Sequence, residues 1–304
     1  MKHMKGKVEN GMEKLKKWMN QRMHFLFTLP AAIIYIIFLI VPFVKGILYG
    51  FTDWNGLTKK YNYIFFKNYI NLLSDKRIKG SIFFTLRYSM ALLVLTVLIG
   101  LGLAILLNRN IKLRGIIRTT YFFPAVLSMI IVGLIFNQIY MHALPGFGKM
   151  VGIKALSKNI LADTSLAFLG ILFVNLWQGL AVPTVLLLAG LQSVPKELLE
   201  AASIDGANGL KKFFFIIFPY LIPSLNMVVI LAFKNGLTSF DYIMAMTGGG
   251  PNKSTESVGF LIYKYAFAES KFSYANALAV ILFIAIGIVS LIQVKGMSRF
   301  EVNE

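Results

Sequence analysis

Six long runs without a charged residue constrain this chain more than any other feature of its sequence. The runs cover residues 25–44, 88–107, 119–141, 166–195, 213–233 and 272–294. A helix needs about 20 apolar residues to cross about 30 Å of hydrocarbon. The runs are continuous in Leu, Ile, Val and Phe, so they lack the in-and-out alternation of barrel strands. The sequence therefore predicts an all-α membrane protein with six transmembrane helices.

The fourth and the first run each differ from a simple membrane span. The fourth is longer than one crossing, so its terminal LQSVP is expected at the membrane interface. The first follows a basic segment, as the core of a signal peptide does, but it exceeds the usual core of about 7–15 apolar residues and no convincing cleavage site follows. We interpret it as an uncleaved anchor. Only 14% of the residues are charged, against about 25% in soluble proteins, which agrees with a membrane location.

Lys and Arg residues set the expected orientation, because loops rich in them tend to stay in the cytoplasm. The N-terminal segment 1–24 holds several, and RNIKLRG between the second and third runs is short and dense in them. Both termini are therefore expected in the cytoplasm. The net charge of +18 is explained by topology and by attraction to anionic lipid headgroups, since the cations flank the runs and form no stripe with interleaved aromatic residues. Nucleic acid is not an expected partner.

Several chemical functions are excluded by what the sequence lacks. The chain has no cysteine, which removes thiolate catalysis and thiolate metal sites. Its histidines, His3, His24 and His142, lie far apart in sequence, and no glycine-rich nucleotide loop with Lys and Ser or Thr is present. No catalytic residue and no metal site can be assigned. The chain is not expected to be an enzyme or to bind a cofactor itself.

An acidic segment, ELLEAASIDGANG at 197–209, lies between the fourth and fifth runs. Pro195 suits the first turn of a helix and Gly206 suits the left-handed residue that ends one, so a helix of about 11 residues is predicted on the cytoplasmic side. Leu198 and Ala202 would share a face by their i,i+4 spacing and form a small apolar patch. Such a helix could fill a groove on another protein. An ordinary interfacial helix resting on lipid headgroups is the alternative.

The longer stretch ELLEAASIDGANGLKKFFFIIFPYLIP resembles the EAA loop of ATP-binding-cassette importer permeases. The matching positions are Glu200, Ala201, Ala202, Gly206, Ile216 and Pro219, and Phe218 stands where the family usually has Leu. The resemblance extends over nearly the whole chain and points to the sugar-uptake branch, through FKNYINLLSD and MAMTGGGPNKSTESVGFLIYKYAF among others. FFTLRYS departs from the family, which commonly has Asn-Thr-Leu there.

This resemblance implies a type I ABC importer permease fold in a bacterial or archaeal cytoplasmic membrane. The chain would form half of a sugar pathway with a second, homologous permease, two ATPase subunits that bind ATP and Mg²⁺, and an extracytoplasmic solute-binding protein. The ATPase-coupling residues implied are Glu200, Ala201, Ala202, Asp205 and Gly206. Glu200 would meet a basic residue of the ATPase, whereas Asp205 and Gly206 would shape the helix exit. Asp205 could instead accept only local backbone hydrogen bonds.

Polar residues inside the runs are candidates for the solute pathway, because they are costly in a membrane unless they face a cavity or a partner. The alternative for each is a hydrogen bond between helices, worth about 0.6 kcal/mol. Lys234 is more simply explained as a cation that reaches the outer headgroups along its stem. The wider set also holds Asn137, Trp177, Gln178 and Asn226. Similarity to the maltose system, whose pore is lined from either side of the EAA loop, favours Ser128, Asn175, Gly179, Asn235 and Ser239.

The resemblance also divides the chain into segments. Residues 1–24 would be a cytoplasmic basic tail, 25–80 the first transmembrane helix with an external loop, 81–297 the permease core with its EAA loop at about 195–219, and 298–304 the cytoplasmic C-terminus. A polyol or a glycerol-phosphate-type solute remains an alternative substrate. A passive facilitator or a membrane scaffold is the alternative of a different class, although neither explains both the acidic helix and the polar residues within the runs.

Overall fold

The computed structural model describes residues 23, 27–109 and 114–297. The predicted basic tail and C-terminal segment 298–304 lie outside the described residues, apart from Met23. Within the described part, five helices are long and apolar enough to cross a membrane, and a bent pair of helices makes a sixth. No strand occurs in these residues beyond one isolated antiparallel bridge between Thr52 and Tyr63. The predicted all-α membrane fold with six spans is confirmed.

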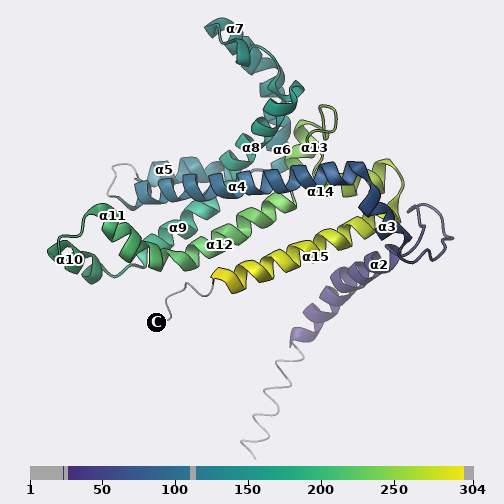
Figure 1. The fold of residues 1–304 in the computed structure, drawn as a ribbon, viewed down its shortest axis with the longest axis horizontal. Coiled ribbons are helices and arrows are strands. Elements are labelled where there is room, and N and C mark those ends of the chain that lie inside the picture. The colour runs from purple at the N-terminus through teal and green to yellow at the C-terminus, as the bar shows by residue number, and fades with distance from the viewer. Residues whose placement is uncertain (1–22, 24–26, 110–113, 298–304) are drawn as a thin grey trace, which may run out of the picture.

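The spans follow one another along the chain with short helices between them (Figure 1). The first is Phe27–Tyr49, the second is α4 (Lys76–Asn108), and the third is Met129–Val151. The fourth is the pair α8 (Thr164–Gly179) and α9 (Ala181–Gln192). The fifth and sixth are Gly209–Leu237 and Phe272–Gly296. Their parts and the intervening helices are η1 (Ile36–Ile40), α2 (Val41–Tyr49), α3 (Lys67–Ser74), α5 (Arg114–Phe122), η2 (Phe123–Val126), α6 (Met129–Gln138), η3 (Ile139–Ala143), α7 (Leu144–Val151), η4 (Lys154–Leu156), η5 (Ile160–Ala162), α10 (Lys196–Ile204), α11 (Gly209–Lys212), η6 (Phe213–Ile217), α12 (Phe218–Leu237), α13 (Asp241–Met246), α14 (Val258–Tyr263), η7 (Lys264–Ala268) and α15 (Phe272–Met297).

Three helices, α4, α9 and α12, pack side by side and form the centre of the bundle (Figure 1). Leu187 and Leu188 of α9 and Leu221 of α12 are almost completely buried between them. The helices can approach closely because Gly236 of α12 lies against α4, where an added Cβ would come within 2.5 Å of the Ser89 Cα. A glycine at this position therefore sets how α12 meets α4.

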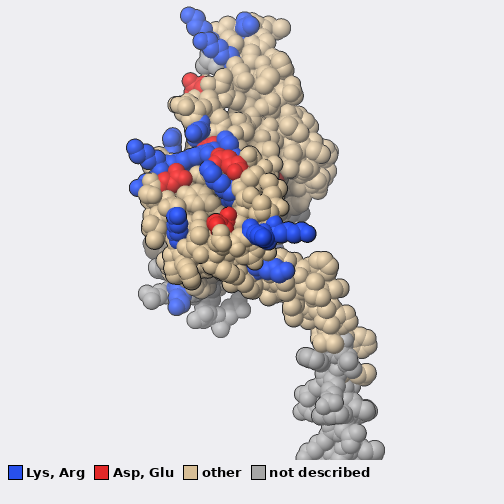
Figure 2. Space-filling view, turned by 90° about the vertical axis from the view of Figure 1, so that its right-hand side faces the viewer, with Lys and Arg blue, Asp and Glu red and all other residues tan. Residues whose placement is uncertain are grey.

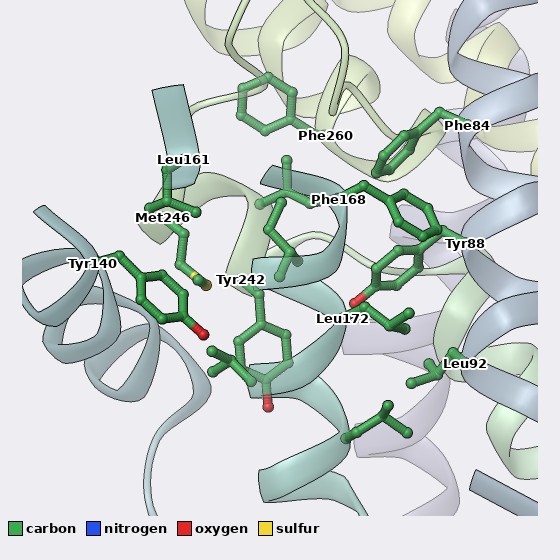
Figure 3. Close-up of a cluster of buried hydrophobic side chains, with 14 of the residues drawn as sticks. Phe84, Tyr88, Leu92, Tyr140, Leu161, Phe168, Leu172, Tyr242, Met246 and Phe260 are labelled. Carbon is green, nitrogen blue, oxygen red and sulfur yellow. The ribbon is translucent and has the colours of Figure 1, made fainter. Parts of the chain in front are cut away.

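A second buried cluster joins α4 to η3, η5, α8, α13 and α14 (Figure 3). Its aromatic rings come from five elements, so residues far apart in sequence meet at one place. The labelled members are Phe84, Tyr88 and Leu92 of α4, Tyr140 of η3, Leu161 of η5, Phe168 and Leu172 of α8, Tyr242 and Met246 of α13, and Phe260 of α14. Buried aromatic pairs of this kind fix the relative placement of their helices.

The prediction of one continuous helix over 119–141 is wrong. The chain instead forms α5 and the 3₁₀ turn η2, and then becomes extended at Leu127 and Ser128 before α6 begins. Pro124 lies in η2 and has no backbone N–H to continue a helical ladder. The third span therefore begins at Met129 and continues to Val151, beyond the predicted end. Apolar composition identified the segment but could not show this break.

The fourth span is bent, which its unusual length did not reveal. The axes of α8 and α9 differ by 52° at Leu180. Pro183 lies within the first turn of α9 and cannot donate to the carbonyl of Gly179 four residues earlier, so the ladder is interrupted where the helix turns. Helix α9 ends at Gln192, and α10 begins after Pro195. Beyond the bend, α9 packs against α4 and α12.

The bundle has two distinct ends (Figure 1). Helices α10 and α11 lie together at one end, and α3 with its neighbouring loops lies at the other. The first span diverges from the other spans, and no residue of η1 or α2 is buried. Its apolar surface is therefore available to lipid or to another subunit.

Candidate functional site

A cavity of about 400 Å³ lies between α4, the η2–α6 junction, the α8–α9 bend and the end of α12. Four of the five favoured pore residues line it, namely Asn175, Gly179, Asn235 and Ser239. Asn175 and Gly179 lie in the last turns of α8, just before the bend. Asn235 lies in the last turn of α12, and Ser239 follows that helix. The α8–α9 bend and the end of α12 thus bring residues separated by about 60 positions to one wall.

Ser128 is the favoured residue that the cavity does not include. It is exposed in the extended link between η2 and α6, whereas its neighbours Leu127 and Met129 both line the cavity. In extended backbone, successive side chains point to opposite sides. The prediction placed Ser128 in a continuous helix, and the break in that helix explains why its side chain lies outside the cavity.

Hydrogen bonds hold the polar wall of the cavity in place. The Asn175 side-chain amide donates to the hydroxyl of the buried Tyr88 over 2.8 Å. The Gln178 amide donates to the carbonyl of Leu127 over 2.7 Å, and its carbonyl oxygen accepts from the Tyr242 hydroxyl over 2.7 Å. These bonds tie α8 to α4, to η2 and to α13. The wall is therefore ordered by the surrounding helices before any solute binds.

Four further polar residues line the cavity and were not among the candidates. They are Thr96 of α4, Thr238 just after α12, and Asp241 and Tyr242 at the start of α13. Asp241 lies two residues after Ser239 and eight residues beyond the end of the fifth run, so a search within the runs missed it, although an acid so close to a run was a usable signal. Thr96 gave no comparable signal, because threonine can return its hydroxyl to its own helix backbone.

Gln178 of the wider set also lines the cavity, whereas the other candidates of that set lie away from it. The Asn137 amide donates to the Met246 carbonyl over 2.6 Å and so links α6 to α13, which is the interhelical role weighed as its alternative. Trp177 packs its ring on Phe136 with a centroid separation of 5.3 Å. Asn226 is buried within α12, and Lys234 is exposed near its end.

The helix predicted after Pro195 is present as α10, and Gly206 has the left-handed conformation expected after it, with φ of +74°. The side chains of Glu200, Ala201 and Asp205 are exposed at this end of the bundle. No ion pair to any of them occurs within the part of the chain that the structure describes. Their charged and small groups are therefore free to meet another protein.

Ala202 differs from the expectation, because it is only 8% exposed and does not contribute to a free apolar patch with Leu198. Its carbonyl accepts from the N–H of Ala207 over 2.9 Å, which closes the turn after α10. The exposed apolar residues at this end include Leu198, Ile204 and Leu210. The i,i+4 spacing places Leu198 and Ala202 on one face of α10, but only Leu198 of the two is exposed.

A polar cavity within a bundle of membrane-spanning helices, together with an acidic helix exposed at one end, defines a solute-transport subunit. Residues 96–299 match the family described as binding-protein-dependent transport system inner membrane component. The chain belongs to this family, and it is therefore a multi-pass transport component rather than an enzyme, as predicted.

The relatives cover almost the full chain. The multiple sugar-binding transport system permease protein MsmF of Streptococcus mutans is 44% identical over 288 residues, which are 95% of this chain and 99% of MsmF. The probable starch degradation products transport system permease protein AmyD of Thermoanaerobacterium thermosulfurigenes is 32% identical over 291 residues, with 96% of this chain and 99% of AmyD covered. These names support the predicted resemblance to carbohydrate importer permeases.

The fold also matches a solved structure. A chain of the bacterial ABC transporter involved in the import of the acidic polysaccharide alginate superposes with a TM-score of 0.80 at 18% identity. The superposition covers 93% of this chain and 98% of that chain. The predicted ABC importer permease fold is thereby confirmed.

Proposed function

We propose that this chain is one of two permease subunits of an ATP-driven importer for a sugar or an oligosaccharide. The observation that carries the proposal is the convergence of Asn175, Gly179, Asn235 and Ser239 on one cavity. The names of MsmF and AmyD support carbohydrate as the class of solute. Residues 81–297 would supply the permease core of this subunit.

The chemistry of the cavity suits a sugar. The amides of Asn175 and Asn235 and the hydroxyls of Thr238 and Ser239 can both donate and accept hydrogen bonds, as sugar hydroxyls require. Phe240 adds an aromatic ring to the same wall, and such a ring can cover the C–H surface of a sugar. Small-molecule sites commonly combine a largely apolar wall with a few placed polar groups.

A second, homologous permease would complete the pathway. Gly179, Asn235 and Thr238 are exposed although they line the cavity, so this wall is open on the side that they share. Exposed amides and hydroxyls within a membrane-spanning region favour contact with a partner or with water over contact with lipid. Half a pathway on each of two subunits accounts for this one-sided wall.

Helix α10 would dock in a cleft of an ATPase subunit on the cytoplasmic side, with both termini of the chain on that side. The exposed Glu200, Ala201 and Asp205 at the tip support this role, together with the left-handed Gly206 that ends the helix. ATP-driven movement of the ATPase pair would then turn the permease between inward-open and outward-open forms. A solute-binding protein would deliver the sugar from outside.

The test is the ATPase activity of the complex reconstituted with its ATPase subunits and its binding protein. The wild-type complex is expected to respond to the binding protein with sugar, and Glu200→Ala to lose the response or the ATPase subunits. Glu197→Ala, an exposed acid in the first turn of the same helix, is the matched control and should retain both. If Glu200→Ala matches the wild type in both respects, coupling does not depend on this carboxylate.

A further inference from the structure

The outer end of the bundle holds a cluster of ion pairs centred on Arg77, near the start of α4. Its Nε and Nη2 each donate to one oxygen of Glu256 over 2.7 Å, and its Nη1 donates to Glu269 over 2.7 Å. Lys264 pairs with Glu256 at 3.1 Å, and Lys271 pairs with Glu269 at 2.9 Å. Figure 2 views this end of the molecule and shows basic and acidic side chains gathered there. One guanidinium thus joins segments that lie 179 and 192 residues away.

Glu256 is the buried member of the cluster, with its side chain 2% exposed. Burial opposes its ionisation, but hydrogen bonds from Arg77 and Lys264 outweigh burial and hold the pKa of the carboxyl below its ordinary value. A two-point bond between a guanidinium and a carboxylate restricts the orientation of both groups. The pair therefore fixes the position of the chain at Glu256, in the loop between α13 and α14.

The residues that follow Glu256 contact the wall of the cavity. The Ser257 hydroxyl donates to the carbonyl of Ser239, and the N–H of Val258 donates to the Thr85 hydroxyl over 2.9 Å. Gly259 lies so close that an added Cβ would be 3.2 Å from the Ser239 carbonyl oxygen. The backbone at 256–259 therefore packs directly on the segment that carries Ser239.

The loop before Glu256 is braced internally. The Thr255 hydroxyl donates to the Gly250 carbonyl over 2.6 Å and lies 2.8 Å from the Thr247 hydroxyl. The N–H of Ser254 donates to the Pro251 carbonyl over 2.9 Å. Thr255, Glu256 and Ser257 are all buried, whereas Asn252 and Lys253 at the tip are exposed. A loop held in this way moves as a unit, and its base is attached to α4 through Arg77.

We propose that Arg77 is a positioning residue for the solute cavity, acting through Glu256 and Ser257 on the segment that carries Ser239. Arg77 does not line the cavity, so its effect would pass along the backbone and not through contact with the solute. With the ion pair intact, Ser239 and its neighbour Phe240 hold their places in the wall. Without it, this segment moves more freely and the cavity binds solute less well. The solute readout rests on the proposed importer function.

The test uses the full importer complex with Arg77→Gln. The solute concentration for half-maximal uptake is expected to rise by about 2- to 30-fold, the range that remote coupling residues cover, with the maximal rate largely kept. Amide hydrogens of residues 239–244 are expected to exchange faster, while those of α9 keep their rates. Lys271→Gln is the matched control, because it removes the more exposed pair with Glu269 and leaves both ion pairs of Glu256 in place. It should leave both measurements unchanged.

Ser257→Ala covers the case in which Arg77→Gln does not assemble. It removes the hydroxyl that contacts Ser239 and leaves the ion pairs, and Ser257→Thr, which keeps a hydroxyl, controls for the loss. Ser257→Ala is expected to shift uptake and exchange in the same direction as Arg77→Gln. Unchanged half-saturation and exchange in the assembled variants would overturn the inference. Faster exchange at 239–244 in a complex that transports no sugar would support the positioning role and contradict the proposed function.

Discussion

The side-chain amide of Asn175 donates a hydrogen bond to the hydroxyl of Tyr88 over 2.8 Å and so joins α8 to α4 at the wall of the cavity. Tyr88 is fully buried, so its hydroxyl has few other groups to meet. The bond fixes which way the amide presents its donor and acceptor atoms. A variant that removes only the Tyr88 hydroxyl therefore tests this hydrogen bond separately from the packing of the ring.

Tyr88→Phe should weaken solute binding without preventing assembly. The phenylalanine keeps the ring and removes the acceptor for Asn175, and a net hydrogen bond is worth about 0.5–1.5 kcal/mol. The solute concentration for half-maximal uptake should rise by about 2- to 10-fold. Tyr140→Phe is the control, because the Tyr140 hydroxyl makes only a 3.5 Å contact with the Gly170 carbonyl, away from the cavity. An equal effect of both variants would show that general packing, not the amide, is responsible.

Ile204→Ser should lower the affinity of the permease for its ATPase subunit. Ile204 is 87% exposed at the end of α10, and burying a side chain of this size at an interface contributes about 1.5–3 kcal/mol. Retention of the ATPase during purification at increasing dilution should fall by about tenfold or more. Leu57→Ser, whose leucine is 79% exposed in the loop between α2 and α3, should retain the ATPase as the wild type does. If Ile204→Ser retains the ATPase as well as the wild type does, the Ile204 side chain lies outside the interface with the ATPase.

The number of spans and the acidic helix could be predicted from sequence because each depends on a local signal. A long run without charged residues indicates a segment that lies in the membrane. Pro195 and Gly206 mark helix ends by their own backbone preferences. A charge-free run does not by itself show whether the span is straight, broken or bent. Pro124 lies at the break and Pro183 close to the bend at Leu180, but a proline can be tolerated within a membrane-spanning helix, so neither the prolines nor the apolar composition revealed these features.

The same distinction explains the candidate site. Asn175 and Asn235 could be selected because a polar residue in or just after an apolar run is unusual and because the resemblance to the maltose system favours them, and both line the cavity. Ser128 was selected on the same grounds but lies where the helix of the third run is broken. The backbone there is extended, so neighbouring side chains point to opposite sides of the chain. The Arg77–Glu256 pair had no sequence signal, since it joins residues 179 positions apart.

Gly236→Val should disrupt packing of α12 on α4, and Gly102→Val should not. A Cβ at Gly236 would lie within 2.5 Å of the Ser89 Cα, which is backbone and cannot rotate away. Nothing lies within 4 Å of the corresponding position at Gly102. Overpacking commonly costs about 1–3 kcal/mol, and a backbone clash is the severe case. Thermal unfolding of the purified complex should therefore occur at a lower temperature for Gly236→Val alone, and similar losses in both variants would contradict this account.

The stability contributed by Glu256 should disappear in acid. Its pKa is set by burial, which raises it, and by Arg77 and Lys264, which lower it further than burial raises it, so the folded-state value lies below the ordinary 4.5. Such a group stabilises the fold fully above pH 4.5 and loses this contribution as the pH falls through the folded-state value. Glu256→Gln should therefore be less stable than the wild type near neutral pH, by about 3–5 kcal/mol for a broken buried pair.

The unfolding temperatures of the two proteins should converge as the pH falls below 4.5, whereas Glu197→Gln on the exposed surface of α10 should follow the wild type throughout. A constant difference between Glu256→Gln and the wild type across this range would mean that the Glu256 carboxylate contributes by its shape and not by its charge.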